Sequence, residues 1–175
     1  MDILNKPAAP ATTDADVEMK IRGLMMDPVT NMPIIVLKDV NSDIVLPIWV
    51  GMYEANAIAL EIEKSTPPRP MTHDLLRNAI RGLNAHVDKV VVSELRDDTF
   101  YATIWMHQDG ELVTMDARPS DALALALRSD CPIYVSRQVL DSSKLTANGA
   151  QNIDSEQLRR WLEGLGDEDM GRYKM

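Results

Sequence analysis

Two segments of the chain place an arginine, a proline, a hydroxyl residue and an aspartate ahead of an apolar, helix-like stretch. The first runs from Arg69 to Asp74 and contains His73, and the second runs from Asp116 to Asp121. Proline fixes its own φ angle, so the polar side chains beside it are held in defined directions. An arginine can clamp a phosphate group, carboxylates can hold a divalent cation, and a histidine can transfer a proton. The two segments therefore carry residue types suited to phosphate chemistry.

Helix capping explains part of both segments without any ligand. Thr72 and Ser120 are expected to cap two helices, and the aspartates Asp74 and Asp121 would complement the helix dipole in the first turn. The prolines also suit a helix start. Capping does not account for four further residues: Arg69, His73, Asp116 and Arg118. Both interpretations, a ligand site and a set of helix caps, stay open on the sequence alone.

A third helix start carries another carboxylate. Gly51 interrupts a strand pattern, and the helix expected at 53–64 begins with a tyrosine followed by Glu54. Two more histidines, His86 and His107, lie in or beside expected strands without the spacing of metal ligands. The sequence also lacks HExxH, CxxC, Walker, GxGxxG and GxSxG patterns, which disfavours the common zinc, nucleotide and serine-hydrolase sites.

The composition limits the class of protein. The chain has 175 residues, of which 45% are hydrophobic, enough for one domain with a sizeable core and tails. Its formal net charge of -9 argues against a wide basic surface for nucleic acid and favours a local site, a protein partner or acidic groups that hold a cation. No apolar run approaches the roughly 20 residues of a membrane span. With a lone cysteine, Cys131, and no secretory signal, these features predict a cytoplasmic protein that does not enter a membrane.

The elements that must position these residues follow a regular order: three strands joined by short turns, then a helix, twice over. Short turns imply antiparallel meanders, so the predicted fold is α+β, with two meander-plus-helix units sharing one core of mainly antiparallel or mixed sheet. A duplication is one interpretation of the two units. The last of the helices is apolar all round and is expected to be buried. The expected strands are 17–26, 33–37, 44–50, 87–95, 100–107, 111–116 and 131–135, and the expected helices are 53–64, 72–83 and 121–128.

The predicted domain organisation is a single core with an extension at each end. We expect a disordered N-terminal tail at 1–16 and a core domain at 17–141. A linker and an amphipathic C-terminal helix are expected at 142–166, followed by a short charged tail at 167–175. An apolar stripe around Trp161 would dock that helix on the main body or bind a partner.

Several strings in the core resemble the bifunctional nuclease family. They occur in the family's order and extend roughly from Val17 to Asp141, almost the whole core. The strings are Leu46-Pro47-Ile48-Trp49-Val50-Gly51 with Glu54-Ala55, Arg69-Pro70-Met71-Thr72-His73-Asp74, Phe100-Tyr101-Ala102, Asp116-Ala117-Arg118-Pro119-Ser120-Asp121-Ala122, and Pro132-Ile133-Tyr134-Val135. The resemblance implies a compact α+β domain that forms homo-oligomers and hydrolyses phosphodiester bonds in both DNA and RNA.

The first hypothesis that follows is a metal-assisted nuclease with nucleic acid as substrate. Asp116 and Asp121, with Glu54 or Asp74 as a further candidate ligand, would hold Mg²⁺ or Mn²⁺. Arg69 or Arg118 would stabilise charge on the phosphoryl oxygens, and His73 would move a proton. The full set of candidate catalytic residues is Glu54, Arg69, His73, Asp74 and Arg118.

The alternative hypothesis is a non-enzymatic ligand-binding or oligomeric interaction module. In that case the same residues lock the fold through helix caps and buried ion pairs, and the net negative charge presents no difficulty. The two hypotheses differ in whether the polar residues converge in one site or form separate buried pairs.

Overall fold

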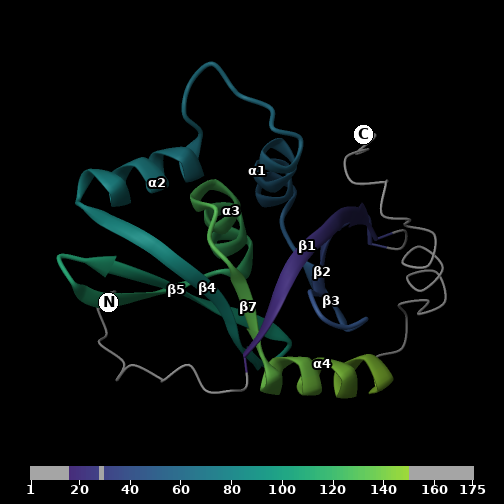
Figure 1. Cartoon of the computed structure of the whole chain (residues 1–175). Helices are drawn as coiled ribbons and strands as arrows, with labels where there is room; N and C mark the ends of the chain where they lie inside the picture. Colours follow the sequence, from purple (N-terminus) through teal and green to yellow (C-terminus); the bar gives the residue numbers. More distant parts are fainter. Residues whose placement is uncertain (1–15, 28–29, 150–175) are drawn as a thin grey trace.

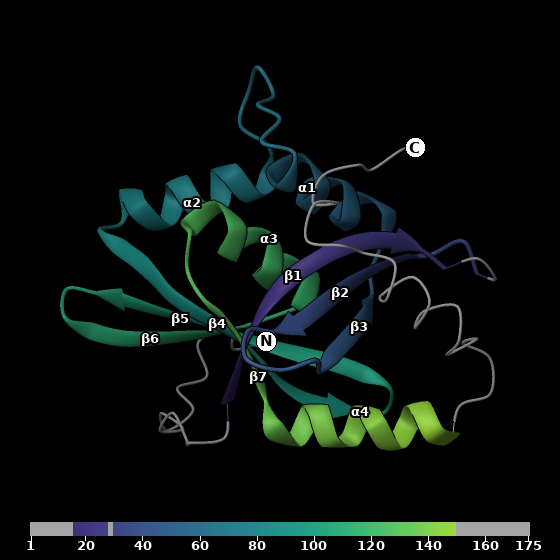
Figure 2. The same cartoon turned by 45° about the vertical axis from the view of Figure 1, so that its right-hand side comes forward.

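One mixed β-sheet with helices packed on it forms the part of the protein that the computed structural model describes, residues 16–27 and 30–149 (Figures 1 and 2). Seven strands in this part follow the order β3-β2-β1-β7-β4-β5-β6 across the sheet. The strands are β1 (Asp16–Met26), β2 (Pro33–Asp39), β3 (Val45–Trp49), β4 (Ala85–Arg96), β5 (Thr99–Gln108), β6 (Glu111–Ala117) and β7 (Ile133–Ser136). Each strand lies within a few residues of its expected position.

The sheet consists of two antiparallel meanders joined through a central strand. Strands β1, β2 and β3 pair antiparallel in sequence order, and so do β4, β5 and β6. Strand β7 lies between the two meanders, antiparallel to β1 and parallel to β4. Each meander leads into a helix, so the predicted α+β class with two meander-plus-helix units sharing one sheet is confirmed.

Three helices form the layer that carries the candidate site: α1 (Met52–Ile62), α2 (Thr72–Gly82) and α3 (Pro119–Ser129). Helix α3 contacts both α1 and α2 and also packs on β4 and β5. Its side chains from Ala122 to Ala126 are at most 1% exposed, which confirms the expectation of a buried apolar helix. In the view of Figure 1, α3 lies between α2 and α1.

A fourth helix, α4 (Arg137–Gly149), contacts β4 and β7 and lies below the strands in the view of Figure 1, whereas α1, α2 and α3 lie above them. No helix was expected here, and α4 extends into the range 142–166 that was expected to open with a linker. Val139 and Leu140 are 1% exposed, so the apolar face of α4 belongs to the core. The predicted amphipathic helix around Trp161 and both predicted tails lie outside the described residues, apart from Asp16.

The helix starts differ from the expected caps. Helix α2 has Met71, not Thr72, at its N-cap, and the Met71 N–H donates to Asp74 Oδ2 over 2.8 Å. Helix α3 has Arg118 at its N-cap and Pro119 as its first residue, so Ser120 lies inside the first turn and is buried. The expectation that Thr72 and Ser120 cap these helices is therefore wrong. In α2, the capping contact is made by Asp74, the third residue of the helix, whose carboxylate accepts the hydrogen bond from the N-cap N–H.

In the described part of the chain, no helix combines the length and the apolar character needed to span a membrane.

Candidate functional site

The first turns of three helices meet in one network of ion pairs. His73 on α2 lies with Nε2 3.0 Å from Asp121 Oδ1 on α3. Arg118, at the start of α3, donates from Nε to Asp121 Oδ2 over 2.7 Å and from a terminal nitrogen to Asp121 Oδ1 over 3.1 Å. The other terminal nitrogen of Arg118 lies 2.8 Å from Glu54 Oε1 on α1. Four of the predicted site residues, Glu54, His73, Arg118 and Asp121, are thus brought together.

The electrostatics of the network fix the proton positions. Burial raises the pKa of Asp121, but hydrogen bonds from Arg118 and His73 outweigh it and hold the pKa below its ordinary value of 3.8. The hydrogen bonds and charge of Asp121, and then those of Glu54, raise the pKa of Arg118. Asp121 is therefore an ionised carboxylate that can only accept, so Nε2 of His73 carries the hydrogen. Nδ1 of a neutral His73 is then an acceptor, and it has no hydrogen-bond partner within the described residues.

The four side chains differ in their access to solvent. The His73 side chain is 12% exposed and the Glu54 side chain 18%, whereas the Arg118 side chain is 66% exposed. The ring of His73 is thus held in place by its surroundings, and the guanidinium of Arg118 forms the open edge of the network. An anion that approaches from solvent reaches Arg118 first.

Gly51 makes room for the Glu54 carboxylate. Gly51 is the N-cap of α1, with φ -71° and ψ 156°, and a Cβ built at this position would lie 2.2 Å from Glu54 Oε2. The backbone conformation suits any residue, so the glycine is needed here for space rather than for its φ angle. Any side chain at position 51 therefore forces the Glu54 carboxylate to move.

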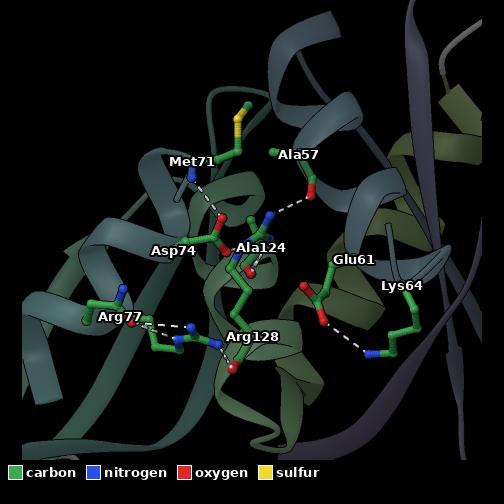
Figure 3. A network of polar contacts seen from close by, with 9 residues as sticks. Ala57, Glu61, Lys64, Met71, Asp74, Arg77, Ala124 and Arg128 are labelled. Atoms are coloured by element: carbon green, nitrogen blue, oxygen red, sulfur yellow. Dashed lines mark hydrogen bonds and ion pairs between the residues drawn. The ribbon is translucent and has the colours of Figure 1, made fainter. Parts of the chain in front are cut away.

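Asp74 belongs to a second, separate network that holds the three helices together (Figure 3). Its Oδ1 accepts from Arg128 Nε over 2.7 Å, and the Arg128 side chain is only 2% exposed. The two terminal nitrogens of Arg128 each donate over 3.0 Å, one to the carbonyl of Ala124 on α3 and one to that of Ala57 on α1. Burial raises the pKa of Asp74, but the Met71 N–H and Arg128 outweigh it and lower the pKa. The arrangement fits a structural ion pair.

Arg128 was not identified from the sequence. A single cation in the last turn of an otherwise apolar helix could have indicated it, because such a charge must find a partner when the helix is buried. A cation in the last turn also interacts favourably with the helix dipole, and this interaction explains Arg128 without any carboxylate partner.

Arg69 lies apart from the network of Glu54, His73, Arg118 and Asp121. It lines a pocket of about 430 Å³ formed by the end of α1, the proline-rich segment and the start of α2. Lys64 and Arg77 line the same pocket, where Lys64 pairs with Glu61 over 3.0 Å. Arg69 and Arg77 have no carboxylate within ion-pair distance among the described residues. The pocket is therefore locally positive in a chain of net negative charge.

Asp116 also lies apart. It pairs with Thr103 on the neighbouring strand β5 and is exposed. Its neighbour Ala117 packs against the core, and side chains alternate between the two faces of a strand, so Asp116 points to the face turned away from that core. The side chain of Asp116 makes no hydrogen bond or ion pair within residues 16–27 and 30–149.

The two remaining histidines form a cluster that the sequence did not indicate. His86 on β4 and His107 on β5 are paired directly across the two strands, and both contact Asp88. The sequence shows no ligand spacing around these histidines because the cluster arises from pairing across strands and not from spacing along the chain.

The comparisons with known proteins identify the family. The model of the bifunctional nuclease domain matches residues 35–148, and the chain belongs to this family, as its motifs indicated. The chain is 34% identical over 161 residues to an uncharacterized protein of Mycobacterium tuberculosis strain H37Rv, covering 87% of this chain and 96% of that protein. It is 25% identical over 118 residues to bifunctional nuclease 1 of Oryza sativa subsp. indica, covering 66% of this chain and 36% of the rice protein. A bifunctional nuclease of Oryza minuta matches to the same extent.

Proposed function

We propose that the protein is a nuclease that hydrolyses phosphodiester bonds in DNA and RNA at the network of Glu54, His73, Arg118 and Asp121. The observation that supports the proposal is the meeting of a histidine–aspartate pair and an exposed arginine at three helix starts. Membership of the bifunctional nuclease domain family and the names of the plant relatives agree with it.

In this mechanism His73 acts as the general base. Asp121 accepts the hydrogen on Nε2, which leaves Nδ1 with a lone pair for the proton of an attacking water. When His73 becomes positively charged, the ionised Asp121 stabilises the imidazolium without taking its proton. The 12% exposure of the ring keeps its orientation fixed through this step.

Arg118 binds the phosphate in this proposal. Its forked donors suit two phosphate oxygens, and they lie at the exposed edge of the network. Two of its five N–H donors remain for a bound phosphate, while the contacts with Glu54 and Asp121 together keep the guanidinium beside His73. Arg69 and Arg77, in the pocket between α1 and α2, would offset the net charge of -9 for the neighbouring stretch of substrate.

Tyr53 would provide a stacking surface for an unpaired base. It precedes Glu54 in the first turn of α1 and is 90% exposed. Stacking of a base on an aromatic ring is tolerant of sequence and occurs in DNA and RNA alike, which suits a nuclease that accepts both. The proposal therefore favours single-stranded substrates.

Binding of Mg²⁺ or Mn²⁺ by Asp116 and Asp121 stays a prediction. A divalent ion would act as a Lewis acid on the phosphate. The present donor set does not fit such an ion, because both oxygens of Asp121 accept from Arg118 or His73 and Asp116 points to the other face of the sheet. We therefore assign no step of the mechanism to an ion at this pair.

The experiment that tests the proposal is a nuclease assay on highly purified full-length protein, with single-stranded DNA and RNA as substrates. We expect cleavage of both, lost in His73→Ala and strongly reduced in Arg118→Ala, and retained in Arg81→Ala, an exposed arginine on α2. Assays with chelator, Mg²⁺ and Mn²⁺, and with Asp116→Asn, test the predicted metal pair. Equal activity in wild type and His73→Ala would refute the site and indicate a contaminating nuclease.

The second candidate function is the non-enzymatic interaction module. The ion pair of Asp74 with the buried Arg128 favours it, because this pair uses a predicted catalytic residue to hold the fold. This function predicts that Arg118→Ala and Asp121→Asn lower the melting temperature while no turnover is detected in any variant. A cytoplasmic location and a homo-oligomeric state stay predictions under both functions.

A further inference from the structure

His86, Asp88 and His107 form a compact cluster on a different part of the sheet from the proposed nuclease site. Asp88 Oδ1 lies 3.1 Å from His86 Nε2, and Asp88 Oδ2 contacts His107 Nδ1. Neighbouring Met106 packs into the core, so strand alternation places His107 on the face turned away from it. None of the three residues is joined to Glu54, His73, Arg118 or Asp121 by a hydrogen bond or ion pair among the described residues.

Two β-bulges in strand β4 create the cluster. Counting back from the pair Arg96–Thr99 beside the turn, a regular hairpin would place His86 opposite Asp109. The register shifts once between Val92 and Glu94 and again between Val87 and Lys89, so His86 pairs with His107 instead. Asp88 is the extra residue of the second bulge, which turns its carboxylate toward both rings. Bulges often redirect a side chain next to a functional site.

The geometry of the cluster is that of a metal site. One ligand atom from each residue can be chosen such that all three lie within 4.8 Å of one another. Ligands held at about 2.0 Å from a tetrahedral ion are about 3.3 Å apart, so small side-chain shifts suffice to close around an ion. The two rings are nearly parallel, with centroids 5.7 Å apart and an interplanar angle of 21°, and one nitrogen of each ring contacts the Asp88 carboxylate.

We propose that His86, Asp88 and His107 bind a divalent transition-metal ion of the Zn²⁺ class. Two imidazoles and one carboxylate prefer Zn²⁺, Co²⁺ or Ni²⁺ to Mg²⁺, which takes oxygen ligands. The exposed fractions of 70% for His86 and 42% for His107 leave one side of the site open to solvent, where water or an external ligand completes the coordination. The site is therefore distinct from the Mg²⁺ or Mn²⁺ pair predicted at Asp116 and Asp121.

The test is a Co²⁺ titration of tag-free, full-length protein, followed by visible absorption and then by displacement with Zn²⁺. We expect one equivalent to bind with the absorption bands of a nitrogen- and oxygen-ligated ion, and Zn²⁺ to raise the melting temperature. His86→Ala, His107→Ala and Asp88→Asn should each weaken binding at least tenfold. Excess Mg²⁺ should leave the Co²⁺ spectrum unchanged.

The chain supplies a matched control, because it has three histidines and only His73 lies outside the cluster. His73→Ala should bind Co²⁺ as the wild type does. Circular dichroism checks that each variant is folded. If His86→Ala is not folded, His86→Gln, which retains a polar side chain of similar size, takes its place. Failure of the wild type to bind Co²⁺ or Zn²⁺ stoichiometrically would overturn the proposal and leave a hydrogen-bonded His–Asp–His cluster. Wild-type affinity in folded His86 and His107 variants would overturn it as well.

Discussion

Nε2 of His73 and Oδ1 of Asp121 lie 3.0 Å apart, although the two residues are separated by 48 positions in the chain. The contact joins the first turn of α2 to the first turn of α3. Because Asp121 also holds Arg118 through two hydrogen bonds, one carboxylate orients both the proposed base and the proposed phosphate ligand. Asp121 is therefore the residue on which the site depends most.

The first prediction is that Asp121→Asn lowers the rate of phosphodiester hydrolysis by about 10²- to 10⁴-fold. An asparagine cannot compensate the positive charge that develops on His73, and its amide no longer selects the tautomer with hydrogen on Nε2. Initial rates on single-stranded DNA and RNA measure the effect.

Asp109→Asn is the matched control for this prediction, because it makes the same chemical change at an exposed turn where asparagine tolerates the φ angle of 51°. The control should retain the wild-type rate. A folded Asp121→Asn protein that is as active as the control would contradict the assigned role.

The second prediction concerns stability in acid. The pKa values of Asp74 and Asp121 are held below 3.8 in the folded protein, so the unfolded chain binds more protons just below that pH. The stabilisation is complete above pH 3.8 and is lost as the pH falls through the folded-state values. The urea concentration at the unfolding midpoint, measured from pH 6 to pH 3, should fall once the pH is below about 4. This fall should be smaller in Asp74→Asn and in Asp121→Asn. An unchanged slope in both variants would contradict these ion pairs.

The fold could be predicted largely because its signals are local. Short turns and strand-length apolar runs indicate the two meanders, and the alternating alanines and leucines after Asp121 indicate a buried helix. The helix at Arg137–Gly149 was missed because its buried apolar residues Val139 and Leu140 are few, although Ser136 caps its start by accepting from the Val139 N–H over 3.3 Å. An apolar pattern this short is weak evidence for a helix.

The site could be predicted only in part, because its contacts depend on packing between distant elements. The segment from Asp116 to Asp121 shows the limit: strand alternation and the helix start send its two aspartates in different directions. The partners of Asp74 depend on how α2 packs on α3, which brings Arg128 within 2.7 Å. The pairing of His86 with His107 depends on two bulges that no turn signal reveals.

The third prediction is that Arg128→Met destabilises the protein by about 3 kcal/mol, because it leaves the half-buried Asp74 carboxylate without its buried cation. The carbonyls of Ala57 and Ala124 lose their donors as well. Equilibrium urea unfolding at neutral pH measures the loss.

Two further variants distinguish the loss of the Asp74–Arg128 ion pair from the general effect of replacing an arginine by methionine. The exposed Arg81→Met on the same helical layer should change stability by no more than about 0.5 kcal/mol. The double change of Asp74→Leu with Arg128→Met should recover much of the loss, since apolar residues can replace a buried pair at little cost. If Arg128→Met is as stable as Arg81→Met, the network of Figure 3 does not hold the helices together.

The fourth prediction is that Gly51→Ala impairs activity while it leaves the fold stable. The new Cβ would lie 2.2 Å from Glu54 Oε2, and the Glu54 side chain can rotate away, whereas the φ of -71° accepts alanine without strain. Once the Glu54 carboxylate moves, Arg118 loses its 2.8 Å contact and its orientation beside His73. A misplacement of this size can lower the rate by up to about 100-fold.

The comparison with Glu54→Gln makes this fourth prediction specific. If Gly51 acts only through the Glu54 carboxylate, the two single variants and the double variant should show similar losses of activity, because the second change has nothing further to remove. Melting temperatures of all three should stay close to that of the wild type. Additive losses would mean that Gly51 affects the site by another route, such as the entry of α1, and a large fall in melting temperature would mean that the glycine serves the fold.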